Sequence, residues 1–179
     1  NDKGVRDLPK PKLKLSRQES INGKFAVEEV RQITGKDKVV VFQPFGRGSQ
    51  PVGNFIIDEG GRSFEYQNMI NIVHKLQKKY AVIYMGEHEI NFQAECPEPV
   101  ASPRGASLRD WAGIIAEADV FIGCDSVGQH LAYAAEKPAV VIVGATCKEN
   151  ISYPNEPTFE VLDMGEGARI YDPIRVTFD

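Results

Sequence analysis

Residues 125–130, which read Asp-Ser-Val-Gly-Gln-His, carry the densest set of groups that could bind an anion. An apolar run precedes them and small residues follow, which predicts a strand passing into a helix with almost no loop. Ser126 is expected to cap that helix, and Gln129 to complete a capping box. The amides of Val127 and Gly128 would then lie at the positive helix end, where phosphate groups bind.

His130 lies four residues after Ser126 and would share a helical face with it. An ordinary helix start with a surface histidine accounts for these residues about equally well, because helix caps are frequent and site motifs rarer.

Two arginines could bring positive charge to the same place. Arg47 lies in the glycine-rich loop from Phe45 to Gln50, and Arg62 directly precedes a predicted helix. The loop is not a P-loop, because no Gly-Lys-Ser/Thr follows, and it lacks the third glycine of the dinucleotide fingerprint. A mobile surface loop and a solvated arginine are the alternative interpretations.

Glu89 belongs to a polar turn, Glu87-His88-Glu89, that follows another apolar run. A carboxylate at the carboxyl end of a parallel strand commonly binds ribose hydroxyls, although a solvated turn is equally consistent with the residues. The three histidines lack metal-ligand spacing with any cysteine, so we expect no metal and no other cofactor. Cys147 has no base nearby in the sequence, and Cys124 is most simply a small core residue.

The composition sets limits on the function. The chain has 179 residues, 42% of them apolar, with 21 basic and 25 acidic side chains and a net charge of −4. That balance argues against a nucleic-acid-binding protein, and no run approaches the roughly 18 apolar residues of a membrane span. Three cysteines make no disulfide framework, so we expect a cytoplasmic protein.

The pattern of elements predicts an α/β protein, with a Rossmann-like parallel sheet and helices on both faces. Residues 1–36 are expected to form a linker and a short helix over 25–34, with Phe25, Val30 and Ile33 inward and Gly35 ending it. Residues 37–179 are expected to form the domain. Strands are predicted at 38–42, 81–85, 120–124, 138–143 and 159–162, and helices at 63–79, from Ser107 onward, and at 126–136.

The stretch from Ser107 to Pro154 resembles glycosyltransferase family 9, the heptosyltransferase-like enzymes of GT-B architecture. The resemblance rests on an ordered series of short motifs. They are Leu108-Arg109-Asp110-Trp111-Ala112, Phe121-Ile122-Gly123-Cys124-Asp125-Ser126, His130-Leu131-Ala132-Tyr133-Ala134-Ala135, Lys137-Pro138, Gly144-Ala145-Thr146 and Tyr153-Pro154. A weaker match extends back to residue 38.

The resemblance implies a donor site for a nucleoside-diphosphate sugar, with an ADP-sugar as the first candidate and heptose among the possible sugars. Asp125, Ser126, Gly128 and His130 would surround the diphosphate. Arg62 would reach the phosphates and Glu89 would hold the ribose. The family's glycine after Asp-Ser/Thr is Val127 here, and its β-branched side chain could crowd the phosphate.

The resemblance also implies that this chain is the carboxyl-terminal half of a GT-B enzyme. The acceptor site and the catalytic base would come from an amino-terminal GT-B domain, so no catalytic residue is assigned and the chain alone is expected to be inactive. A non-catalytic binding module of the same fold and a sugar-nucleotide epimerase are the alternatives. A nicotinamide dehydrogenase is disfavoured by the absent glycine fingerprint.

Overall fold

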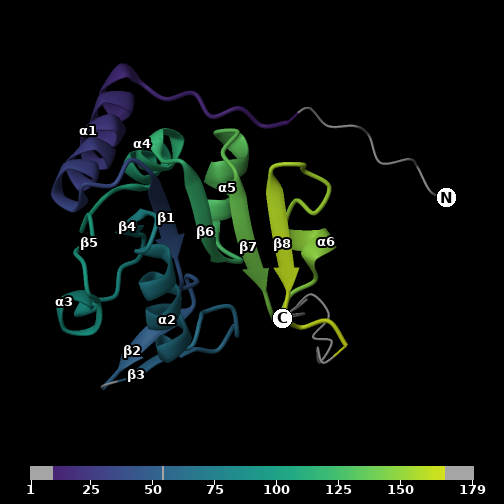
Figure 1. Ribbon diagram of the computed structural model, residues 1–179. Helices are drawn as coiled ribbons and strands as arrows, with labels where there is room; N and C mark the ends of the chain where they lie inside the picture. Colours follow the sequence, from purple (N-terminus) through teal and green to yellow (C-terminus); the bar gives the residue numbers. More distant parts are fainter. Residues whose placement is uncertain (1–9, 54, 168–179) are drawn as a thin grey trace.

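The structure, a computed structural model, describes residues 10–53 and 55–167. Within them, six strands pair in parallel in the order β5-β4-β1-β6-β7-β8 (Figure 1). Their bounds are β1 Val39–Gln43, β4 Ala81–Tyr84, β5 Val100–Ala101, β6 Val120–Cys124, β7 Ala139–Val143 and β8 Phe159–Asp163. All five predicted strands are confirmed, and the two-residue β5 was missed.

Helices cover both faces of this sheet, as predicted. One apolar core joins alternate strand residues, including Val39 and Val41, to α1, α4 and α5. The opposite core joins Val40 and Phe42 to α2. Because every residue of β1 and β4 is buried, their near-continuous apolar runs are what a strand covered on both sides requires. The helices are α1 Arg17–Thr34, α2 Tyr66–Leu76, α3 Phe92–Glu95, α4 Leu108–Glu117, α5 Val127–Ala134 and α6 Lys148–Ile151.

Helix α1 is longer than predicted, and the face that it buries differs from the predicted one. It begins after Ser16, which forms a capping box with Glu19, and it ends at Gly35 with a φ of 67°, as predicted. Phe25 and Ile33 were predicted to face inward, but they are 70% and 62% exposed. That prediction was wrong; Val30, the third residue, is buried.

A pair of glycines decides which face of α1 is buried. A Cβ on Gly23 would lie 2.3 Å from the Gly113 carbonyl group of α4, so the two helices approach each other backbone to backbone. This close approach turns Gly23, Val27 and Val30 inward. The Ser107–Asp110 capping box predicted for α4 is confirmed.

The glycine-rich segment predicted as a loop contains a β-hairpin. Strands β2 (Ser49–Val52) and β3 (Phe55–Asp58) pair antiparallel, apart from the main sheet and beside α2 (Figure 1).

In the described part of the chain, no helix is both long and apolar enough to cross a membrane.

Candidate functional site at the carboxyl ends of the strands

The strand order places a topological switch point beside β1. The chain runs from β1 outward to β4 and β5 on one side, and then returns to β6, β7 and β8 on the other. The connections after β1 and β6 therefore diverge, and in open parallel sheets this is where ligands bind. This switch point, the candidate crevice, lies between the residues after Gln43 and those after Cys124, which include the predicted segment 125–130.

The amino-terminal end of α5 is capped by a residue from β1. The Gly128 amide donates to Gln43 Oε1 at 2.9 Å, and Gln43 Nε2 donates to Ser126 Oγ at 3.2 Å. Ser126 makes no side-chain cap bond to its own helix, so the capping box predicted from Ser126 and Gln129 is wrong. The Gly128 amide, predicted as a phosphate donor, is already satisfied here.

Gly128 is required by packing as well. A Cβ at this position would lie 2.4 Å from Phe121 Cε2 and 2.5 Å from Gln43 Oε1. The neighbouring Val127 is exposed. It is the first residue of α5, so its amide points out of the helix end, where orphan donors are available to a ligand.

Asp125 is buried and holds two other segments in place. Its Oδ1 accepts from Gln129 Nε2 at 3.0 Å, and its Oδ2 accepts from Thr146 Oγ1 at 2.8 Å. Gln129 also donates to the Ile151 carbonyl. The carboxylate thus ties the end of β6 to the segment that follows β7, instead of facing the crevice unpaired.

His130 lies against an aromatic cluster. Its Nδ1 is 2.7 Å from the Tyr153 hydroxyl, and Tyr153 stacks on Tyr133 with ring centroids 3.6 Å apart. Partial burial lowers the pKa of His130, and the nearby Asp125 carboxylate opposes that shift less strongly. The ring is therefore predominantly neutral at pH 7, where it can offer a hydrogen bond but little positive charge.

Arg62 is held at the crevice by a tight loop around Asp58. That carboxylate accepts from the amides of Gly60, Arg62 and Ser63 and from the Ser63 hydroxyl at 2.6 Å. Burial alone would raise the pKa of Asp58, but these bonds together hold it below its usual value. Hydrogen bonds to the Asp58 carboxylate therefore hold this loop in a defined conformation.

The positive charge of Arg62 acts on Cys124 at the end of β6. Burial, followed by the Asp125 charge, raises the pKa of Cys124 to about 12, and Arg62 is the nearby charge that opposes this rise. A Cβ on Gly61 would lie 3.4 Å from Ala145 Cβ, so this loop also touches the segment after β7. No hydrogen-bond or ion-pair partner of the guanidinium is found among residues 10–53 and 55–167. Cys124 stays a protonated core thiol, as predicted.

Arg47 and Glu89 are less closely associated with the crevice. Arg47 is exposed in the turn before β2. Glu89 pairs with Arg104 at 3.0 Å, and both side chains are more than two thirds exposed. Within the described ranges, no hydrogen bond or ion pair joins either residue to segment 125–130.

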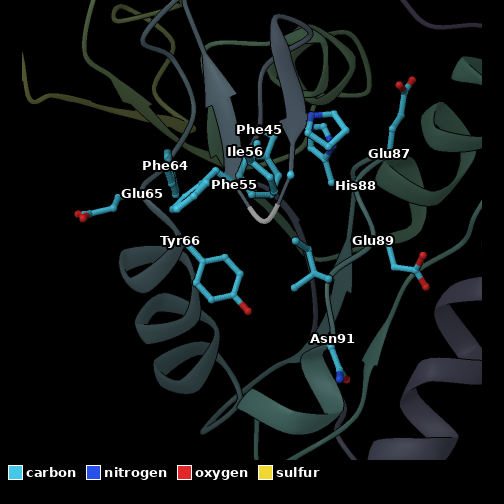
Figure 2. A pocket seen from close by; sticks show the side chains of 13 residues that line it. Phe45, Phe55, Ile56, Phe64, Glu65, Tyr66, Glu87, His88, Glu89 and Asn91 are labelled. Atoms are coloured by element: carbon cyan, nitrogen blue, oxygen red, sulfur yellow. The ribbon is translucent and has the colours of Figure 1, made fainter.

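Two cavities flank Glu89, and neither is lined by Arg62 or by residues 125–130. One, of about 640 Å³, lies between the hairpin, the start of α2 and the loop after β4 (Figure 2). The other, of about 750 Å³, continues toward Arg104. Sequence reasoning missed the first cavity, because most of its walls come from segments treated as loops. Among the described residues, no group of three His, Cys, Asp or Glu side chains could hold a metal ion.

The strand order, the covered faces and the crevice define a Rossmann-like α/β domain. No protein-family profile matches this chain, and no curated protein sequence does. Solved structures do match. The fold is similar to that of the E. coli ADP-heptose lipopolysaccharide heptosyltransferase II, with a TM-score of 0.59 and 16% identity over 88% of this chain. A glycosyltransferase family 9 structure from Veillonella parvula matches with a TM-score of 0.61 and 11% identity over 89% of this chain.

A third match is the E. coli heptosyltransferase WaaC, solved with ADP, with a TM-score of 0.55 and 16% identity over 70% of this chain. The fold is thus heptosyltransferase-like, as the sequence resemblance predicted. The matches cover 47%, 44% and 38% of those enzymes, so this chain spans less than half their length.

Proposed function

We propose that this domain binds the nucleoside diphosphate of a sugar donor in the crevice between β1 and β6, as the donor-binding part of a glycosyltransferase. The observation that carries the proposal is the convergence there of the α5 amino terminus with the Arg62 loop, on a heptosyltransferase-like fold. A diphosphate needs amide donors and cations, and this edge of the sheet offers both.

The Val127 amide, the Ser126 hydroxyl and the Arg62 guanidinium are the proposed diphosphate ligands. The Gly128 amide donates to the Gln43 side chain, so that side chain would have to move before the amide could also bind the diphosphate. Asp125 acts as a positioning residue through Gln129 and Thr146. His130 is proposed as a neutral hydrogen-bonding group at the same helix end, with Arg47 reaching in from the turn before β2.

Glu89 is the proposed ribose ligand, because its exposed carboxylate can accept hydrogen bonds from vicinal hydroxyls once its ion pair with Arg104 breaks. ADP is the first nucleotide to test, since one similar structure was solved with ADP and another is an ADP-heptose heptosyltransferase.

In the whole enzyme, the sugar would pass from the diphosphate to an acceptor hydroxyl. Negative charge grows on the leaving diphosphate, so Arg62 and the helix end would stabilise the transition state more than the bound donor. The acceptor site and the base that takes the hydroxyl proton are proposed to lie on a separate amino-terminal domain. This domain alone would bind nucleotide without transferring sugar.

Calorimetric titration with ADP, UDP and GDP tests the proposal. We expect heat with at least one of them, and we expect Arg62→Ala to weaken that binding by about 1–3 kcal/mol, the loss typical of a charged hydrogen bond. Arg17→Ala is the matched control, because Arg17 is an exposed arginine on α1. No heat with any nucleotide, or equal losses in the two variants, would contradict the proposed site.

A non-catalytic module of the same fold is the second candidate. The observation that favours it is the Gln43 carboxamide on the Gly128 amide, because a satisfied helix end is less available to a phosphate. Nucleotide binding that Arg62→Ala weakens selectively would exclude it.

A further inference from the structure

The cavity of about 640 Å³ beside the hairpin has aromatic walls that the proposed function does not use. Four phenylalanine and tyrosine rings line it, those of Phe45, Phe55, Phe64 and Tyr66, together with the imidazole of His88. Phe55 is 74% exposed and Tyr66 43% exposed, although burying such rings would favour folding. Exposed rings gathered around a hollow are typical of a surface kept for a ligand.

The inner wall of this cavity is already fixed without a ligand. The Phe45 ring meets the rings of His88 and Tyr84 edge-on, with centroids 5.2 and 6.4 Å apart. The His88 Nε2 lies 2.7 Å from Ser49 Oγ, which fastens the hairpin to the loop after β4. A hollow held in this way loses little entropy when a ligand binds.

The charges around the cavity are acidic. None of the 13 lining residues is Lys or Arg, whereas Glu65, Glu87 and Glu89 place carboxylates around the rim, pointing away from the hollow in Figure 2. The guanidinium of Arg104 pairs with Glu89. Such a rim repels phosphates and carboxylates, and it attracts uncharged or ammonium-bearing ligands.

Hydrogen-bonding groups are few but well placed. The Tyr66 ring lies at the hollow in Figure 2, and Asn91 lies at its lower edge. Partial burial, followed by the charge of Glu95, raises the pKa of Tyr66, so its hydroxyl stays protonated and can donate. Aromatic faces with a few peripheral donors and acceptors suit a ring that has apolar C–H faces and a polar edge, which describes a pyranose.

We infer that this cavity binds a sugar ring bearing no acidic group. This inference does not rest on the proposed function. The loop after β4 contributes Glu89 to this cavity, so the cavity would border the proposed ribose position.

Ligand-observed NMR with three methyl glycosides of glucose type tests the inference. We expect methyl glucosaminide to bind most tightly, methyl glucoside next and methyl glucuronide not detectably. The first carries an ammonium group at C2, the second carries no charge, and the third carries a carboxylate in place of the C6 hydroxymethyl group. Phe55→Ala and Tyr66→Ala should each weaken glucosaminide binding about 2–10-fold, the range for one lost aromatic contact. Phe25→Ala is the matched control, because it removes an exposed ring from α1, on the opposite face of the sheet.

Three outcomes would overturn the inference. The first is glucuronide binding as tight as glucosaminide binding. The second is an equal loss of glucosaminide affinity in Phe25→Ala and Phe55→Ala. The third is a loss of ADP affinity in Tyr66→Ala while its glycoside binding is unchanged. The last outcome would make the cavity a nucleobase pocket. Glycoside binding that survives while no nucleotide binds would contradict the proposed function alone.

Discussion

His130 shows how desolvation can set the charge of a single residue. Its position near the start of α5 suggested a group beside the diphosphate, and partial desolvation lowers its pKa and favours the neutral ring. The cation proposed for the site is therefore Arg62.

The lowered pKa predicts how stability depends on pH. The unfolded chain binds a proton at His130 more readily than the folded protein does, so stability is fully present above the unfolded pKa of about 6.5 and falls as the pH drops through the folded value. The melting temperature of the wild type should therefore fall more between pH 7 and pH 5 than that of His130→Gln, which cannot titrate.

Thermal melts of both proteins across this range provide the measurement. All other titrating groups are shared, so the difference between the curves belongs to position 130. A steeper fall in the variant would mean that the folded protein stabilises the charged ring.

At the scale of elements, β1 and α5 are joined by one side chain. Gln43 satisfies the Gly128 amide and also bonds to Ser126, across 85 and 83 sequence positions. It thus performs the capping that Ser126 does not, and it occupies the position where a phosphate oxygen would bind. The ligand-free helix end is stabilised by the same group that a nucleotide would displace.

Gln43→Ala should therefore separate stability from binding. We expect a loss of about 1–2 kcal/mol in the free energy of unfolding, the usual cost of a lost cap, because a buried amide loses its acceptor. Nucleotide affinity should be equal to or tighter than that of the wild type, because no carboxamide competes for the amide.

Denaturant unfolding and calorimetry on the same preparations measure the two effects. Gln32→Ala, an exposed glutamine on α1, is the control and should change neither. Weaker nucleotide binding in Gln43→Ala would instead mean that Gln43 contacts the ligand.

At the scale of the whole molecule, the chain has a continuous sheet with two cores and less than half the length of the similar enzymes. A domain of this kind can hold a donor nucleotide without completing a transfer site. Binding to the folded state alone must then stabilise the fold, whether or not a reaction follows.

Saturating nucleotide should raise the melting temperature. Ligand at 100 times its Kd stabilises by about 2.7 kcal/mol. At about 2–4 °C per kcal/mol for a chain of this size, the shift should be about 5–11 °C. Differential scanning fluorimetry with ADP measures it, and adenosine at the same concentration is the control. Equal shifts with both would show that the diphosphate contributes nothing.

Local signals in the sequence were sufficient for most elements. The apolar runs at β1 and β4 predicted buried strands, because a strand covered on both faces needs apolar residues throughout. The start of α1 could also have been found, since Ser16 and Glu19 have capping-box spacing. The hairpin could not, because Pro51 and Gly53 are typical of a loop and its pairing depends on the surrounding surface.

The sequence by itself determined the layered fold, the helix ends at Gly35 and Ser107, and the meeting of segment 125–130 with the sheet edge. These follow from periodicity and from contacts between near neighbours in the chain. Tertiary structure alone decided that Gln43 caps α5, that Asp125 is tied to Thr146, and that exposed rings surround a cavity beside the hairpin. Each of these joins residues at least 21 positions apart or depends on how separate segments pack, and no local pattern encodes that geometry.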